Sequence, residues 1–130
     1  MQARSRIPVV FTLEGIGKAY GTLQKMLAPL TVEEIRRNLP LEGRASLWGD
    51  EVYFQVPIKR GEEKARSHVD EGSIAYWPMG NALCIFFAPS KPYSPVNLLG
   101  RIERGLELFR KVESGTRIGV TEVKPKGPKR

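Results

Sequence analysis

The sequence has very little cysteine and histidine, with one residue of each, Cys84 and His68. A lone cysteine cannot form an internal disulfide, and its place inside an apolar run is typical of a small buried side chain in a reducing compartment. His68 lies in the charged segment 62–70, where we expect an exposed position. Because zinc sites take three or four closely placed ligands, we expect no metal site, and no motif indicates a cofactor.

Long hydrophobic runs are also absent. No apolar stretch approaches the roughly 18 residues that a transmembrane helix requires. The N-terminal segment contains Arg4 and Arg6, but Pro8, Thr12 and Glu14 interrupt the apolar residues that follow, so we expect no secretory signal. We therefore expect a cytoplasmic protein with no membrane contact.

Acidic residues are absent from the two ends of the chain, which concentrates positive charge there. The net charge is +7, yet residues 7–123 contain 15 basic and 14 acidic residues. Such a near-neutral body argues against a nucleic-acid surface. Residues 124–130 have the Lys, Pro and Gly composition of a disordered basic tail, which could aid solubility or contact RNA phosphates. Sparse Asn and Gln beside abundant Glu, Lys and Arg suggests a thermophile.

Short segments rich in β-branched and aromatic residues predict an all-β domain of about eight strands. Strands are expected at 7–13, 19–25, 51–56, 73–77, 83–87, 97–103 and 117–123, and an extended segment begins at 44. The segment 83–87 is apolar throughout, so it should lie centrally or under a cover. Within 51–56, alternation places Val52, Phe54 and Val56 on one face, which suits a core.

Two short helices are expected among these strands. Thr31 and Glu34 have the spacing of a capping box, which predicts a helix that includes Val32, Ile35 and Leu39 and stops at residue 40, a proline. A second helix is expected over 106–112, closed by a glycine at 115. Short helices of this kind suit the open ends of a barrel.

Six segments resemble cyclophilin sequences in the order in which cyclophilins carry them. They are 17–23, 28–36, 48–54, 76–81, 86–87 and 98–105. Segment 28–36, APLTVEEIR, is similar to the family's helix motif, and 98–105, LLGRIERG, to its Val-Phe-Gly strand. The chain as a whole most closely resembles a small, uncharacterised cyclophilin-like family of archaea and bacteria.

The resemblance implies a closed eight-stranded barrel over residues 1–123, with a helix at each open end and a binding groove on the outer wall. Barrels of this size are filled by side chains, so a ligand would bind outside or at a mouth. Cyclophilins use an arginine, a phenylalanine, a glutamine and a histidine there. Phe87 matches the phenylalanine, but 51–57 contains no arginine and Val96 stands at the histidine position. The resemblance therefore implies binding with weak or no prolyl isomerisation.

Polar and aromatic side chains near these segments form a candidate ligand site for a peptide or a small molecule. The residues expected to line it are Glu51, Tyr53, Gln55, Trp77, Asn81 and Phe87. The alternative is an ordinary solvated strand face. Glu51 would suit acid/base chemistry only if burial raised its pKa. Trp48 could be buried or exposed, and burial is the commoner case.

Three functions are compatible with these observations. The first is a binding module that uses the outer groove. The second is an enzyme with weak peptidyl-prolyl isomerase or small-amide hydrolase activity. The third is an RNA-associated protein that uses the basic tail at 124–130.

Overall fold

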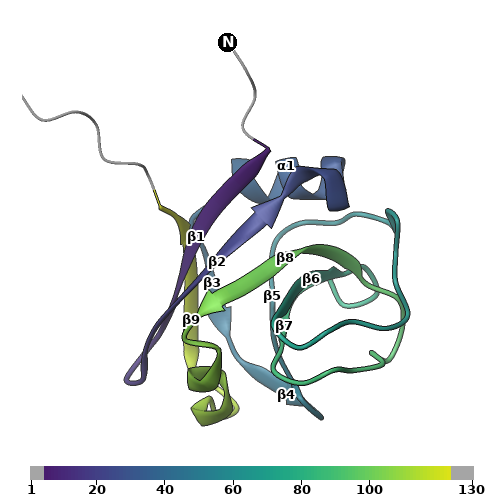
Figure 1. Cartoon of the computed structure of the whole chain (residues 1–130). Helices are drawn as coiled ribbons and strands as arrows, with labels where there is room; N and C mark the ends of the chain where they lie inside the picture. The colour runs from purple at the N-terminus through teal and green to yellow at the C-terminus, as the bar shows by residue number, and fades with distance from the viewer. Residues whose placement is uncertain (1–4, 124–130) are drawn as a thin grey trace, which may run out of the picture.

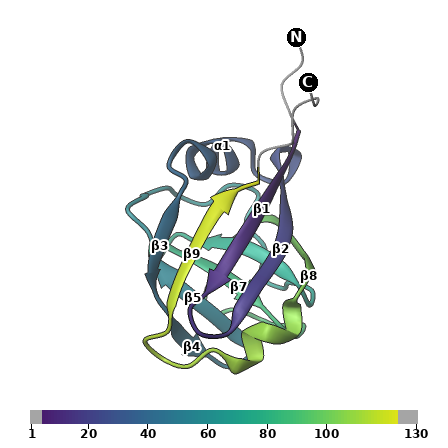
Figure 2. The same ribbon diagram turned by 90° about the vertical axis from the view of Figure 1, so that its left-hand side faces the viewer.

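A single antiparallel sheet of nine strands curls into a barrel (Figure 1 and Figure 2). The computed structural model describes residues 5–123, so the predicted tail lies outside the described residues. The strands are β1 (Arg6–Leu13), β2 (Gly17–Gln24), β3 (Leu41–Arg44), β4 (Ser46–Trp48), β5 (Glu51–Gln55), β6 (Ser73–Trp77), β7 (Ala82–Phe86), β8 (Asn97–Arg104) and β9 (Arg117–Glu122). They pair in the order β3-β9-β1-β2-β8-β6-β7-β5-β4.

The barrel closes where the two edge strands, β3 and β4, meet. A single residue, Ala45, joins them, and its backbone N–H and carbonyl make hydrogen bonds of 2.8 Å to Thr116 and Gly115. Gly43 of β3 passes so close to β5 that a Cβ there would lie 3.2 Å from the carbonyl oxygen of Gln55. The predicted all-β barrel is confirmed, with nine strands instead of eight because residues 41–44, just ahead of the predicted extended segment, form the additional strand β3.

Helices cover the two ends of the barrel (Figure 2). The α-helix α1 (Pro29–Arg37) follows a 3₁₀ turn, η1 (Lys25–Leu27), and its Val32 and Ile35 are buried. A second 3₁₀ helix, η2 (Leu106–Lys111), lies at the opposite end, where Phe109 packs edge-on against Phe11 with ring centroids 5.9 Å apart. Both predicted helices are present. Within the described residues, no helix is long and apolar enough to span a bilayer.

The predicted capping box of α1 is wrong. The helix begins at Pro29, and Thr31 lies inside its first turn. Glu63, in a distant loop, caps the first turn instead. Its carboxylate accepts hydrogen bonds from the backbone N–H groups of Leu30 at 3.0 Å and of Thr31 at 2.8 Å. Partial burial opposes ionisation of Glu63, but these bonds, the Thr31 hydroxyl and the charge of Arg60 outweigh it and lower its pKa. The helix also ends earlier than predicted, at residue 37.

Apolar side chains form two clusters, one inside the barrel and one on its outer wall. The predicted core face of β5 is confirmed, since Val52, Phe54 and Val56 are buried in the inner cluster. The outer cluster consists of Val69, Ala75, Cys84, Phe86 and Val96, with Tyr53 and Trp77 packed against it.

Strand β7 is buried along its whole length, as its sequence predicts. One face looks into the barrel, and the other carries part of the outer cluster. The loop between β5 and β6 and the loop between β7 and β8 cover this outer cluster. Two antiparallel bridges join the loops to each other, Arg66 to Val96 and Val69 to Ser90. The outer wall beside β5, β6 and β7 is thus a second, smaller core with loops over it, and this is where the candidate site lies.

Candidate functional site

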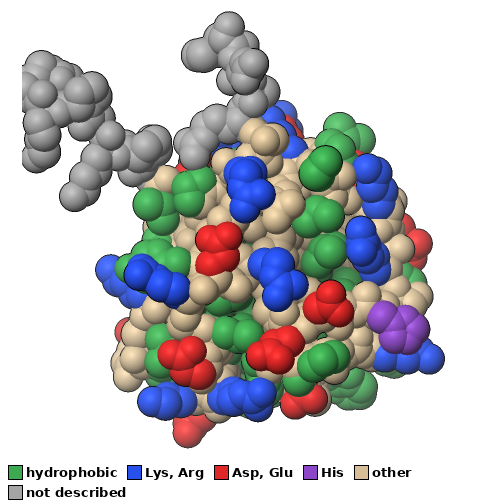
Figure 3. Space-filling model, viewed as in Figure 1, with side chains coloured by type: hydrophobic (Ala, Val, Ile, Leu, Met, Phe, Trp, Pro, Cys, Tyr) green, Lys and Arg blue, Asp and Glu red, His purple; other side chains and the backbone are tan. Residues whose placement is uncertain are grey.

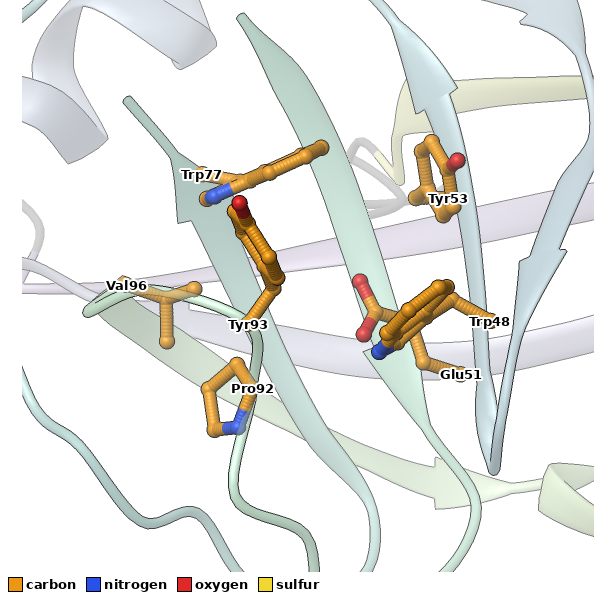
Figure 4. Close-up of a pocket in the computed structure, with 7 residues that line it drawn as sticks. All are labelled: Trp48, Glu51, Tyr53, Trp77, Pro92, Tyr93 and Val96. Carbon is orange, nitrogen blue, oxygen red and sulfur yellow. The ribbon is translucent and has the colours of Figure 1, made fainter. Parts of the chain in front are cut away.

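A cavity of about 240 Å³ opens on the outer wall of the barrel, at the edge of the outer cluster. Its floor and walls come from β4, β5, the end of β6 and the loop that precedes β8 (Figure 4). The lining residues are Trp48, Glu51, Tyr53, Trp77, Pro92, Tyr93 and Val96. Four of these seven side chains are aromatic and one is acidic.

The four aromatic rings form a continuous chain of edge-to-face contacts. Tyr53 meets Trp77 at 5.7 Å and 81°, Trp77 meets Tyr93 at 6.4 Å and 83°, and Tyr93 meets Trp48 at 6.2 Å and 82°. Each such contact adds about 0.5–1.5 kcal/mol beyond the burial of the rings. Trp48 and Tyr93 are nevertheless 57% and 69% exposed, so of the two positions left open for Trp48, buried or exposed, it takes the exposed one. The rings hold one another in place while two of them stay open to solvent.

A hydrogen bond holds the loop that carries Tyr93 against the barrel. The indole N–H of Trp77 donates to the Oγ of Ser94 at 2.6 Å. Two residues later, Val96 exchanges backbone hydrogen bonds of 2.8 and 3.0 Å with Arg66. Because Tyr93 lies just before these two anchors, its ring is positioned over the cavity.

Glu51 places a carboxyl group at the base of the cavity. It is the first residue of β5, lies opposite Phe86 in the register, and is only 6% exposed. The carboxyl points into the space between the rings of Trp48, Tyr53 and Tyr93 (Figure 4). Burial raises the pKa of Glu51 above its ordinary value, against a weaker lowering by a hydrogen bond with Cys84. Within residues 5–123, Glu51 has no ion pair with a basic side chain.

Cys84 lies below this carboxyl, fully buried on the outer face of β7. Burial, together with the negative charge of Glu51 and their hydrogen bond, raises the pKa of its thiol well above the ordinary value. The thiol therefore stays protonated and donates to the carboxyl. The predicted buried position of Cys84 is confirmed, and its hydrogen bond to Glu51 is a contact that the sequence does not reveal.

Comparison with known proteins assigns the barrel to a family. A model of the cyclophilin-like family matches residues 6–121, which is most of the chain. The chain belongs to the cyclophilin-like family.

Two solved structures are similar to this cyclophilin-like domain. A hypothetical protein of Archaeoglobus fulgidus shares 32% identity and a TM-score of 0.78, over 95% of this chain and 100% of that one. McbB, whose structure contains tryptophan, shares 12% identity and a TM-score of 0.77, over 93% of this chain and 46% of that one. At that identity the likeness to McbB establishes the fold alone. No functionally curated protein matches the chain.

The cyclophilin-like fold brings together three of the six residues that sequence reasoning selected. Glu51, Tyr53 and Trp77 line the cavity. Gln55 is exposed and lies on the far side of Tyr53 and Trp77, in a separate depression beside Arg44. The two rings divide the polar face of β5, so Glu51 and Gln55 face different spaces.

The other two selected residues have structural partners away from the cavity. Asn81 occupies the turn between β6 and β7 with φ of 49°, and its side-chain oxygen accepts a hydrogen bond from the Tyr76 hydroxyl at 3.2 Å. Phe87 packs against the barrel core, and the Arg110 guanidinium lies 5.0 Å from its ring centroid. Neither residue lines the cavity.

Sequence reasoning missed four lining residues, Trp48, Pro92, Tyr93 and Val96. Trp48 ends β4, the strand that leads into β5, but no pattern indicated that its ring would border the site. For the other three, the available signal was an aromatic residue inside a loop stiffened by prolines at 89, 92 and 95. The position of that loop depends on long-range contacts, which the sequence pattern does not encode.

Within residues 5–123, the other features considered do not indicate a second site. His68 is exposed, as predicted. In the part of the chain that the structure describes, no group of acidic, histidine or cysteine side chains could hold a metal ion. Basic and acidic side chains are interspersed over the face in Figure 3, so that face has no extended basic patch for nucleic acid.

Proposed function

We propose that this cyclophilin-like domain is a binding module that takes a small molecule, or one side chain of a peptide, into the outer-wall cavity. The observation that carries the proposal is the aromatic cavity itself, with Trp48 and Tyr93 exposed at its rim. Exposed aromatic side chains around a hollow are characteristic of binding sites.

The size of the cavity favours a small ligand group. Its volume of about 240 Å³ is below the roughly 300–1,000 Å³ typical of drug-sized ligands. A head group or a single side chain matches this space better than an extended ligand. The structure of McbB contains tryptophan, but this chain matches 46% of that protein at 12% identity, so the likeness supports the fold alone and not the ligand.

Binding is favoured over efficient prolyl isomerisation because the cavity offers little to a twisted amide. The barrier to amide rotation is about 18–20 kcal/mol, and catalysis requires hydrogen-bond donors placed for the transition state. No arginine, glutamine or histidine is among the seven lining residues. Gln55, the one amide side chain on β5, lies outside the cavity.

An NMR screen of the ¹⁵N-labelled protein tests the proposal. A mixed library of neutral, cationic and anionic fragments, together with short peptides, should yield ligands that shift the indole N–H signal of Trp77. That signal reports on the cavity because the indole N–H donates to Ser94 at its wall. A library whose ligands all shift residues around Pro40 and Leu41, which line a different depression, would contradict the proposal.

Glu51 favours one second candidate, an enzyme that transfers protons. A carboxyl group in an apolar pocket with a raised pKa suits general acid or base chemistry on a small amide. Hydrolysis and prolyl-isomerisation assays should then give a rate above background that falls to background in Glu51→Gln. A rate at background for the unmodified protein would reject this candidate and leave the binding module.

A further inference from the structure

The lining of the cavity is chemically one-sided. Four aromatic rings surround one carboxyl group, and none of the seven lining residues is basic. The rings border the same space into which Glu51 points (Figure 4). An aromatic face is electron-rich whereas its edge is electropositive, so a ring attracts a cation that lies over its face. The carboxylate and the ring faces therefore both favour a positively charged ligand.

The buried carboxyl provides the strongest of these preferences. Removing a carboxylate from water is costly unless an opposite charge or several hydrogen bonds compensate it. Within residues 5–123, the contacts that affect Glu51 include one weak thiol donor, Cys84, and no basic group. A cationic ligand would supply the missing opposite charge to a carboxyl that is itself only 6% exposed.

The aromatic rings select among cations. An ammonium within about 6 Å of a ring face gains roughly 0.5–2 kcal/mol, with tryptophan giving the largest gain. Two of the four rings here are tryptophans, Trp48 and Trp77. A primary ammonium has three N–H donors to satisfy, and the side-chain acceptors in the lining are few, namely the carboxyl of Glu51 and the hydroxyls of Tyr53 and Tyr93. An alkylated ammonium has fewer donors or none, so it suits these walls better.

We propose that the cavity binds an alkylated ammonium group, with Glu51 as its counter-charge and Trp48, Tyr53, Trp77 and Tyr93 as an aromatic cage. This inference rests on the proposed function, because it names the ligand class of the same cavity. The group is either the head of a small free cation or the end of a methylated lysine side chain. Both ligands carry the same alkylated ammonium group, and they differ in the part of the ligand that lies outside the cavity.

A matched pair of probes isolates the charge. Choline and 3,3-dimethylbutan-1-ol have nearly the same shape, and only choline carries a positive charge. Calorimetry should give choline an affinity at least about tenfold higher than that of the alcohol, corresponding to about 1.4 kcal/mol. The preference should largely disappear in Glu51→Gln and persist in the control Glu62→Gln, since Glu62 is exposed in a separate loop.

A second pair of variants tests the rings without disturbing the core. Tyr93 is mostly exposed, so its substitution leaves the barrel intact. Tyr93→Phe keeps the ring and removes the hydroxyl, so it should retain more choline binding than a variant that lacks the ring. Tyr93→Leu keeps apolar bulk without a π-system and should bind choline several-fold more weakly, with little change for the alcohol.

The source of the group is tested with a short peptide that carries trimethyl-lysine, compared with the same peptide carrying unmodified lysine. Binding of the methylated peptide at least about tenfold tighter than choline assigns the group to a peptide, and equal affinities assign it to a small free cation. Equal binding of choline and its neutral analogue, or no binding of either cation, overturns the inference. The fragment screen then decides separately whether the cavity binds any ligand at all.

Discussion

Replacing Glu51 with glutamine should change how stability depends on pH. The substitution keeps the shape of the side chain and removes its titration. Burial raises the pKa of Glu51 from its ordinary value of 4.5, so the folded state holds the proton more tightly than the unfolded chain does. Folding therefore takes up protons between pH 4.5 and the folded-state pKa, and the stability of the unmodified protein falls as pH rises through that window.

The size of the effect follows from proton counting. One group exchanges at most one proton, so the slope is at most about 1.4 kcal/mol for each pH unit. Below the window the difference in unfolding free energy between Glu51→Gln and the unmodified protein should be constant. Through the window it should grow in favour of the glutamine variant, and it should level off once Glu51 is ionised in both states.

Urea denaturation between about pH 3.5 and 8 measures this difference. Contributions from other titrating groups cancel, because both proteins contain them. The exposed Glu62, changed to glutamine, is the matched control for the substitution itself. A flat curve for Glu51→Gln, or one that moves in favour of the carboxylate, would refute the account of a buried, uncompensated carboxyl at the base of the cavity.

Three further predictions concern the scaffold around the site. Glu63→Gln should lower the free energy of unfolding by about 1 kcal/mol at neutral pH, because it weakens the cap of α1. Since the pKa of Glu63 is lowered, this loss of stability should shrink as pH falls below 4.5. An unchanged urea midpoint would contradict the capping role. Cys84 should react with iodoacetamide only when the protein unfolds, and rapid labelling of the native protein would be incompatible with its burial. Gly100→Ala should destabilise the barrel by at least about 2 kcal/mol in thermal or urea melts, since the new Cβ would lie 1.8 Å from a carbonyl oxygen of β2. The control, Gly61→Ala, adds its Cβ in open space and should change stability by less than about 1 kcal/mol in the same melts. Equal effects of the two alanine substitutions would contradict the close approach of β2 and β8.

Periodicity predicted the elements that depend on local patterns. The alternation of Val52, Phe54 and Val56 identified the core face of β5, and the uniformly apolar run in β7 indicated a strand covered on both sides. These predictions succeeded because burial of apolar surface is the main driving force, and its period is visible in a short window.

Contacts between distant segments were the part that sequence patterns could not supply. Glu63 caps α1 from 32 residues beyond Thr31, so the local spacing of Thr31 and Glu34 led to the wrong cap. The strand face containing Glu51 and Gln55 was correct, yet ring contacts from another strand separate the two side chains. Tyr93 reaches the cavity only because its loop docks on the outer wall.

The most direct test of the central claim, that the outer cavity is a ligand site for an ammonium group, is an NMR measurement on the complex with choline. Intermolecular nuclear Overhauser effects should connect the choline methyl protons to the rings of Trp48, Tyr53, Trp77 and Tyr93, which line the cavity together. Effects confined to other parts of the surface, such as the depression beside Pro40, would contradict the claim.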